Sequence, residues 1–347
     1  MSRTTHDPRL NRRHLLGLAA GFAAAGTGGG AVAQTADADL EALIKAAKAE
    51  GQLTYYVGLT ENVAKRMNEA FEKRYGIRTS SARMDAAVLQ QRYAAEAEAG
   101  NIAADALIMA GGADEFAEAG IAKGWLTSLN DAGLPAIKSG QFPARFNRGR
   151  SAIIQISPWL MAYNTEKVKK EDLPKDYPDL LNPKWKGQIL VNDPGLSNAY
   201  LDIWTLLADN YGRDFLEKLR GQIRQVASGA QAIQAVGAGE GVFNFPTVQA
   251  QSDGVKARGA PLETLTMELT TGVQSQTMLT APGKAKHPNA GKLFVNWLLS
   301  PEGNTVVNDD PGGFTVYDTS KLPKRYESPK PGVGARREEI RKLLGFG

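Results

Sequence analysis

Short runs of strand-forming residues alternate with helical patterns through the first half of this chain, and this alternation restricts the possible folds more than any other feature. Strand-type runs occupy residues 53–57, 77–82 and 104–110, and apolar residues spaced as on one helix face follow each run. Gly76 and Gly100 stand where two of these helices are expected to end. Repeated strand–helix units with short loops build sheets that helices cover on both faces, so we expect an α/β fold.

The second half of the chain repeats this arrangement. A strand-type run at 189–191 precedes a helical pattern, and a second run at 242–245 is expected to end at Pro246. The apolar stretch 152–163 is long enough to cross from one domain to another. Because 347 residues exceed what one hydrophobic core usually organises, we expect two domains.

The C-terminal region carries two further patterns. Residues 323–334 are rich in Pro, Gly and Lys, which predicts an irregular surface strap. The basic pairs Arg336-Arg337 and Arg341-Lys342 follow it, and we interpret them as the solvated face of a helix.

The N-terminus has the pattern of an export signal. The adjacent Arg12 and Arg13 precede a weakly apolar run at 15–25, and small residues at 31–33 suit a signal peptidase. We expect twin-arginine export to the periplasm, with cleavage after Ala33. A transmembrane helix is the weaker alternative, because glycines interrupt the run. The segment before the cleavage site carries four arginines against one aspartate, so most of the +4 net charge belongs to it. We therefore expect no nucleic-acid partner.

The composition removes several kinds of catalytic site. The chain has no cysteine, and only His287 of its three histidines lies beyond the export signal. Pro288 follows it, so His287 is interpreted as a helix-entry residue. The glycines at 237, 239 and 241 resemble a dinucleotide fingerprint, but a helical pattern precedes them and a strand follows, which reverses the required order. We expect no catalytic residue, no metal site and no cofactor, while a carboxylate-based enzyme stays open.

Four strand–helix corners are the candidate ligand-binding positions. Ligands of open α/β sheets bind beyond the carboxyl ends of strands, where helices begin. The corners at 58–60, 111–112, 195–198 and 246–249 are rich in Gly, Thr, Ser and Asn. Small residues let a ligand approach the backbone, and free helix N–H groups favour an anionic or strongly polar partner. The alternative is that Thr60, together with Ser197 or Asn198, serves only as a helix cap.

Several strings give the chain a specific resemblance. Pro183-Lys184-Trp185-Lys186-Gly187 and the segment 287–303 are the most distinctive, and further matching segments span nearly all of the mature chain. The chain resembles the periplasmic solute-binding subunits of ABC importers with the type II fold, in the family of ferric-iron-binding proteins. This resemblance implies two lobes, built on mixed sheets flanked by helices and joined by a hinge of two crossover strands. We also expect a monomer, since nothing in the sequence demands a larger assembly. It also implies delivery of a small-molecule solute to a permease in the inner membrane.

The resemblance also implies a division of the chain. The signal occupies residues 1–33, one lobe comprises 34–151 plus 266–318, and the other comprises 152–265 plus 319–347. No internal repeat of 20–50 residues is detected.

The iron ligands of that family have no counterparts at the matching positions. Iron-binding members typically place a histidine, a glutamate and two adjacent tyrosines where this chain has Thr60, Gly111 and the pair Gln249-Ala250. Ferric iron requires anionic oxygen donors, which these residues do not supply. Tyr55 and Tyr56 are adjacent, but in a strand their side chains point to opposite faces.

The positions beside the metal in the family bind an anion, and here they keep small or polar residues, although Pro194 replaces a neighbouring small polar residue. We therefore expect a small organic or phosphorus-containing anion as ligand. Ferric iron or an iron chelate is the alternative, and a secreted enzyme is a third hypothesis. The expected ligand-binding residues are Thr60, Gly111, Gly112, Gly195, Leu196, Ser197, Ser228, Thr247 and Gln249.

Overall fold

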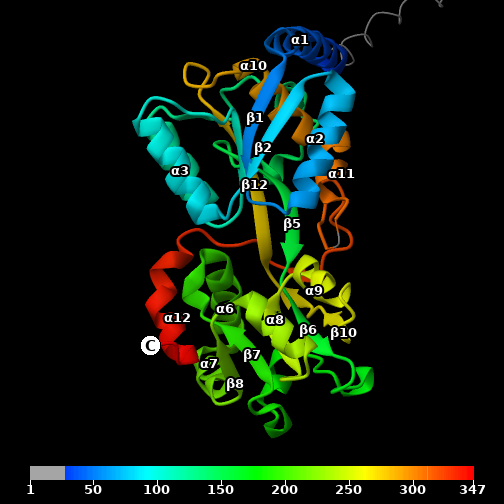
Figure 1. The fold of residues 1–347 in the computed structure, drawn as a ribbon, viewed down its shortest axis with the longest axis vertical. Helices are drawn as coiled ribbons and strands as arrows, with labels where there is room; N and C mark the ends of the chain where they lie inside the picture. Colours follow the sequence, from blue (N-terminus) through cyan, green and yellow to red (C-terminus); the bar gives the residue numbers. More distant parts are fainter. Residues whose placement is uncertain (1–27, 311) are drawn as a thin grey trace, which may run out of the picture.

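The computed structural model describes residues 28–310 and 312–347 and consists of two lobes stacked along the long axis of the molecule (Figure 1). Arg12, Arg13 and the weakly apolar run that follows them lie outside the described residues. The first described helix, α1 (Gly28–Glu50), continues through the expected cleavage position at Ala33. Among the helices that the structure describes, none combines the length and the apolar character needed to cross a bilayer.

The upper lobe, lobe 1, is built on a six-stranded mixed sheet with the order β2-β1-β3-β12-β4, and β5 pairs with β12. Strands β1, β2 and β3 are parallel, and β12 runs antiparallel to them. The strands are β1 (Gln52–Val57), β2 (Arg78–Arg83), β3 (Ala106–Met109), β4 (Leu126–Thr127), β5 (Ala152–Pro158) and β12 (Gly272–Thr280). The helices after α1 are α2 (Glu61–Tyr75), α3 (Ala86–Glu98), α4 (Ala113–Ala122), α5 (Pro135–Lys138), α10 (Pro288–Leu298) and α11 (Pro301–Asn308).

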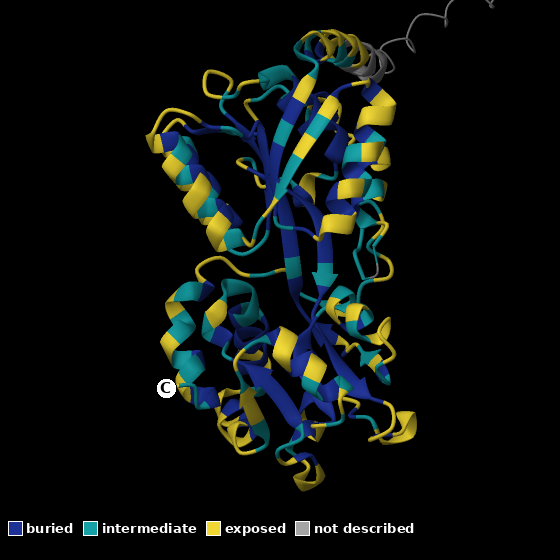
Figure 2. Ribbon diagram, in the orientation of Figure 1, coloured by how far each residue is buried: buried dark blue, intermediate teal, exposed yellow. Residues whose placement is uncertain are grey.

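Helices cover both faces of this sheet, as expected for an α/β fold. Tyr55 packs in a core with Phe71 and Phe294 on one face, whereas its neighbour Tyr56 packs in a second core with Tyr93 on the other. Both tyrosines are fully buried. Their placement on opposite faces confirms that the pair belongs to the core. Figure 2 shows the same pattern for the whole molecule, with buried strands and helices that expose their outer faces.

The lower lobe, lobe 2, is built on a five-stranded mixed sheet with the order β10-β6-β9-β7-β8. Its core contains Trp159, Trp204 and Phe245. The strands are β6 (Leu160–Asn164), β7 (Ile189–Asn192), β8 (Ile223–Val226), β9 (Phe243–Thr247) and β10 (Leu262–Leu265). The helices are α6 (Asn198–Tyr211), α7 (Arg213–Arg220), α8 (Gly229–Gly237), α9 (Gln249–Lys256) and α12 (Arg337–Leu344).

Two adjacent strands connect the lobes. β5 leaves lobe 1 and continues into β6, while β12 returns from lobe 2, and Gly272 of β12 pairs with Pro158 of β5. A Cβ atom on Gly272 would lie 2.5 Å from the carbonyl oxygen of Ser157. The crossing backbones therefore require glycine at this position.

Pro246 lies inside β9, so the prediction that it ends the strand was wrong. Leu160 of β6 pairs with Thr247 while Ala162 pairs with Asn244, so the register shifts opposite Pro246. The pairing of β9 with β7 already stops at Asn244. Pro246 therefore lies at an irregularity where no ladder needs its missing N–H group.

The C-terminal region crosses the waist from the side of α11 and reaches α12 on the opposite side of lobe 2 (Figure 1). Within the C-terminal strap (residues 323–334), β13 (Arg325–Tyr326) pairs with β11 (Leu269–Thr270), and α12 then packs on lobe 2. The interpretation of the basic pairs as a solvated face was wrong for Arg336 and Arg341. They bind Asp209 at 2.6 Å and Asp193 at 3.1 Å. Both arginines are half-buried and are paired with carboxylates of lobe 2, while the apolar face of α12 packs on its core.

Candidate functional site

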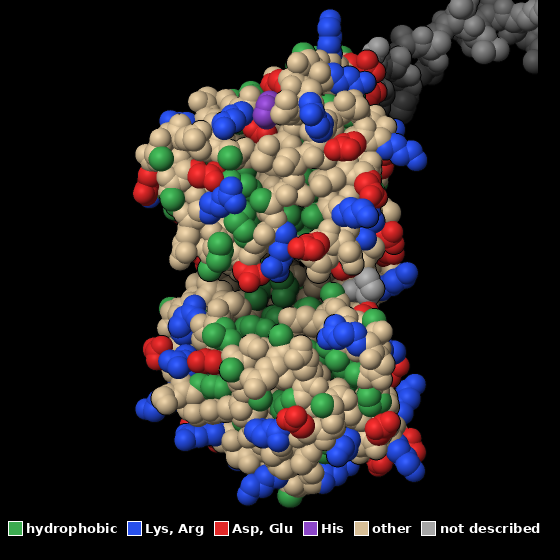
Figure 3. Space-filling model, viewed as in Figure 1, with side chains coloured by type: hydrophobic (Ala, Val, Ile, Leu, Met, Phe, Trp, Pro, Cys, Tyr) green, Lys and Arg blue, Asp and Glu red, His purple; other side chains and the backbone are tan. Residues whose placement is uncertain are grey.

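The carboxyl ends of the parallel strands in the two lobes face each other. Met109, the last residue of β3, pairs with Gln276 on the part of β12 that leads toward the hinge. In lobe 2, Thr247 at the end of β9 pairs with Leu160, the first residue of β6 after the hinge. Figure 3 shows a hollow at the waist between the lobes, with hydrophobic side chains at its base. The expected ligand-binding edges of both sheets therefore border the same waist.

On the lobe 2 side, the first turns of α6, α8 and α9 converge around Gly229. A Cβ atom on Gly229 would lie 2.8 Å from Tyr200 Oη, 3.5 Å from Asn192 Oδ1 and 3.9 Å from Gln251 Oε1. Thr247 donates a hydrogen bond to Gln251 Oε1 at 3.0 Å. We call Asn192, Tyr200, Gly229, Thr247 and Gln251 the lobe 2 cluster. Because the first N–H groups of each helix lack partners within the helix, this cluster has a donor-rich backbone beside it.

The polar atoms of the lobe 2 cluster are partly free to bind a ligand. Asn192 is fully buried, and within the described chain its Oδ1 has no hydrogen-bond partner. Tyr200 stacks on Trp159 with ring centroids 5.1 Å apart, and Trp159 Nε1 donates to the carbonyl of Ala199 at 3.0 Å. Burial raises the pKa of the Tyr200 phenol. The hydroxyl therefore stays protonated and can donate to an anion.

Three of the expected site residues serve as helix caps. The side-chain oxygens of Thr60, Ser197 and Ser228 accept hydrogen bonds from the N–H groups of Val63, Tyr200 and Gln231, at 3.5, 3.3 and 3.1 Å. The capping alternative therefore describes these side chains. Ser197 and Ser228 still position the helix ends that border the lobe 2 cluster, whereas Thr60 is exposed at the start of α2.

Gly195 and Leu196 lie beside α12 and outside the lobe 2 cluster. Arg337 donates to the carbonyl oxygen of Gly195, and a Cβ atom on Gly195 would lie 2.7 Å from Arg341 Cδ. Leu196 is 57% exposed. Gln249 binds Asp253 and Thr264, and it lines a separate cavity beside Phe314.

On the lobe 1 side, Gly111 and Gly112 reach a cavity that both lobes border. Its volume is about 480 Å³, and Asn198 and Ala199 of α6 also line it. Gly112 has a positive φ of 80°, and Gln90 Nε2 donates to the carbonyl of Gly111 at 3.2 Å. The structure therefore brings this predicted corner beside the N-terminus of α6. Further lining residues carry charge, namely Asp114, Glu115, Glu118, Arg148, Arg150, Asp202 and Lys330.

Sequence reasoning missed the buried members of the lobe 2 cluster. Asn192 ends the strand-type run that begins at residue 189, and Tyr200 and Gln251 lie in the first turns of the helices that follow two of the predicted corners. Extending each predicted corner by the last residue of the strand before it and by the first turn of the helix after it would have included all three. In the part of the chain that the structure describes, no three His, Asp or Glu side chains gather closely enough to hold a metal ion.

Known proteins share this architecture. An uncharacterized protein of Haemophilus influenzae is 26% identical over 322 residues, covering 85% of this chain and 90% of the relative. Iron-bound HitA of Pseudomonas aeruginosa superposes with a TM-score of 0.64 at 18% identity, covering 85% of this chain and 98% of its own. AfuA of Actinobacillus pleuropneumoniae, with fructose-6-phosphate bound, superposes with a TM-score of 0.56 at 23% identity, covering 85% and 97%.

These structural matches confirm the predicted two-lobed fold of periplasmic binding proteins. A family model described as bacterial extracellular solute-binding protein matches residues 106–331, which is more than half of the chain. The chain therefore belongs to the bacterial extracellular solute-binding proteins.

Proposed function

We propose that this protein captures a small organic or phosphorus-containing anion at the waist and delivers it to an ABC-importer permease in the inner membrane. The lobe 2 cluster is the observation that carries the proposal. It combines three helix N-termini with the Tyr200 phenol, which is a hydrogen-bond donor beside Gly229. Helix N-termini with small residues beside them suit an oxyanion.

The choice of an anion over ferric iron follows from the side chains at the cluster. Asn192, Tyr200, Thr247 and Gln251 offer amides and hydroxyls, and burial keeps the Tyr200 phenol protonated. Ferric iron binds tightly to carboxylates and phenolates, so this set of donors suits it poorly.

The mechanism requires a change of shape and no chemical step. The two lobes sample open and closed forms about the β5–β6 and β12 crossings. A ligand that contacts both lobes binds the closed form more tightly and shifts the population toward it. In the closed form, the lobe 2 cluster and the corner at Gly111 and Gly112 hold the solute together. The closed surface of both lobes then docks on the permease.

Export and the division into lobes are part of the same proposal. The protein is exported by its twin-arginine signal, cleaved near Ala33 and active as a monomer in the periplasm. The lobes comprise 34–151 plus 266–318 and 152–265 plus 319–347. Val316 packs with lobe 1 and Ile340 packs with lobe 2, in line with this division. At the crossings the packing differs from these bounds, because Ile153 lies in the core of lobe 1 and Leu269 in the core of lobe 2.

A thermal-shift screen of the metal-free protein tests the proposal. The panel contains inorganic phosphate, fructose 6-phosphate, citrate, ferric chloride and spermidine. An anion present at about 100 times its dissociation constant adds about 2.7 kcal/mol of stability and raises the melting temperature. A shift with ferric chloride alone contradicts the anion proposal, and so does the absence of a shift with every anion of the panel.

A further inference from the structure

A small cavity lies beneath the C-terminal strap, apart from the lobe 2 cluster. Its volume is about 150 Å³, and we call it the under-strap cavity. A cavity of about this size in another protein holds a benzene molecule. Its walls are Asp202, Thr205, Leu206 and Asp209 on one face of α6, Thr271 before β12, residues 328–333 of the strap, and Arg336 just before α12. Asp202 and the strap also line the 480 Å³ cavity, which gives a ligand a route of entry.

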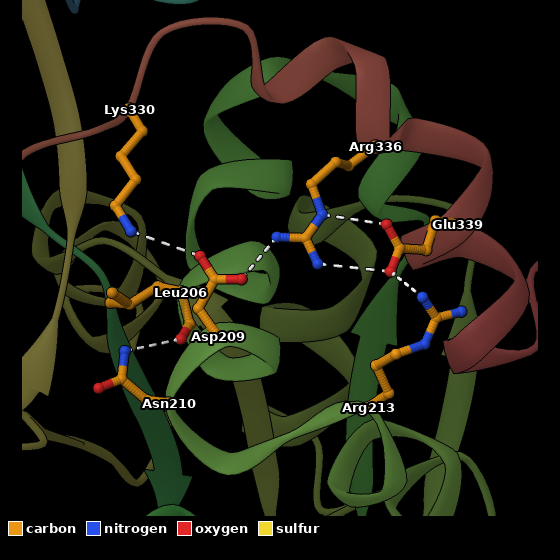
Figure 4. Close-up of polar contacts among 7 residues, drawn as sticks. All are labelled: Leu206, Asp209, Asn210, Arg213, Lys330, Arg336 and Glu339. Atoms are coloured by element: carbon orange, nitrogen blue, oxygen red, sulfur yellow. Dashed lines mark hydrogen bonds and ion pairs between the residues drawn. The ribbon is translucent and has the colours of Figure 1, made fainter.

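Lys330 and Arg336, the two cations at the cavity, are both paired with Asp209, as Figure 4 shows. Lys330 lies 3.4 Å from Asp209, and Arg336 lies 2.6 Å from the other oxygen of that carboxylate. Arg336 also binds Glu339 at 3.0 Å. Burial alone would raise the pKa of Asp209, but the hydrogen bonds from Arg336 and Lys330 outweigh it and hold the pKa below its usual value.

Asp202 lies two turns earlier on the same face of α6 and has no such support. Its carboxyl makes no hydrogen bond or ion pair within the described residues, and it is half-buried. Burial, and then the negative charge of Glu115, raise its pKa to about 7. Lys330 and Arg336 thus neutralise Asp209 on this face of α6, whereas Asp202 on the same face has no cation beside it in the described part of the chain.

Two threonines beside Asp202 also lack partners. The side chains of Thr205 and Thr271 are 6% and 2% exposed, and neither hydroxyl oxygen has a hydrogen-bond partner among the residues that the structure describes. A buried hydroxyl without a partner costs about 1–3 kcal/mol, so a molecule in the cavity that binds these hydroxyls would be stabilised.

We propose that the under-strap cavity binds a compact organic ammonium ion. An ammonium group has three donors and no acceptor, which suits one carboxylate and two hydroxyl oxygens. The apolar part of the ion packs against Leu206 and the prolines at 329 and 331 of the strap. Lys330 and Arg336 also line the cavity, but both are paired with Asp209, so among the described residues Asp202 supplies the unpaired charge there and favours a cation. This cavity shares Asp202 and strap residues with the waist cavity, but none of the residues of the lobe 2 cluster, which carries the anion proposal, lines it.

Calorimetry on the full chain at about pH 8, where Asp202 is ionised, tests the proposal. The probe is ethylammonium chloride, and tetramethylammonium chloride, which has no N–H donor, is the matched control. We expect saturable binding of ethylammonium and none of tetramethylammonium. Asp202→Asn weakens the binding about tenfold or more, because it removes a charged hydrogen-bond partner. Thr205→Val and Thr271→Val, which keep the side-chain shape, weaken it several-fold.

Asp214→Asn, on the exposed first turn of α7, serves as the control substitution and leaves the binding unchanged. No saturable binding to the wild-type chain means that the cavity holds only water, and this result overturns the proposal. Equal binding by the wild type and by Thr205→Val overturns it as well, even if Asp202→Asn does not fold. Binding of the anions in the thermal-shift screen is measured separately, so either proposal can fail alone.

Discussion

Asp202 makes the stability of the folded protein depend on pH. Its pKa is raised from the ordinary value of 3.8 to about 7. Below about pH 3.8 the carboxyl is protonated in both the folded and the unfolded chain. Between 3.8 and about 7 the unfolded chain loses this proton while the folded protein keeps it, so stability falls as pH rises through this window. Above about 7 both states are ionised and the full cost of the buried charge is present.

Asp202→Asn removes this cost. We expect the variant without ligand to melt at a higher temperature than the wild type at about pH 8, with the difference shrinking toward about pH 4. The expected gain is on the order of one to a few kcal/mol, and solvent at the half-buried carboxyl reduces it. Differential scanning calorimetry across this pH range measures the difference. A constant difference at every pH contradicts the assignment of the shift to Asp202.

Gly229 provides a second prediction at the scale of single residues. In Gly229→Ala the new methyl group lies 2.8 Å from Tyr200 Oη and must displace this hydroxyl from the lobe 2 cluster. We expect anion binding to weaken about tenfold, which is the loss of one charged hydrogen bond, while the melting temperature changes little. Isothermal titration with the anion identified in the screen measures the loss.

The double variant Gly229→Ala with Tyr200→Phe separates crowding from the loss of the hydroxyl. If crowding alone weakens binding, the double variant recovers it, since the clashing oxygen is gone. If the Tyr200 hydroxyl contacts the ligand, the double variant stays weak, as does Tyr200→Phe alone. Undiminished binding in all three variants would show that the solute does not contact the lobe 2 cluster.

The sequence predicts only those site residues whose role follows from their immediate neighbours in the chain. The rule that ligands bind where a strand meets the following helix predicts Gly111 and Gly112, because these glycines directly follow a strand-type run in the sequence. It does not predict Asn192 or Asp202, because their surroundings come from distant parts of the chain: Gly229 lies near Asn192, and residues 328–333 lie near Asp202. Gly195 and Leu196 satisfy the rule locally, yet α12 arrives from the distant C-terminus and packs beside them.

At the scale of elements, α12 is held by its apolar face. Ile340 and Leu344 are fully buried in the core of lobe 2. We expect Ile340→Ala to lower the free energy of unfolding by about 2–5 kcal/mol and Ile340→Val by about 0.5–1.5 kcal/mol. Urea denaturation followed by tryptophan fluorescence measures both values. If the two substitutions cost the same, the packing of α12 on lobe 2 is not as described.

Most elements are predictable because the strand and helix periods are visible along the chain. α2 begins at Glu61 after its Thr60 cap and ends before Gly76, where φ is 69°, so both boundaries follow from local chemistry. Pro246 shows the limit, since its tolerance within β9 depends on the register of β6. The antiparallel placement of β12 between β3 and β5 likewise joins residues more than a hundred positions apart.

At the scale of the whole molecule, two rigid cores are joined by few strands. Each lobe has its own buried clusters, and the crossings at β5–β6 and β12 are the main covalent links between them. The strap adds a third link, because it leaves lobe 1 and is bound to α6 through Lys330 and Asp209. Rotation about the crossings can close the waist without disturbing either core.

Closure gives a prediction for the whole molecule. The chain has no cysteine, so Val88→Cys on α3 and Gln234→Cys on α8 introduce two labelling sites, one on each lobe. Both positions are exposed, so labels do not disturb the cores. We expect the anion identified in the screen to raise energy transfer between the dyes, because a ligand that contacts both lobes favours the closed form. The dissociation constant from this titration should equal the one found by calorimetry.

The control pair, Val88→Cys with Glu69→Cys, lies within lobe 1 and should show no change. Saturating ligand without any change in the first pair would mean that the solute binds one lobe alone, and closure would then have no part in its capture.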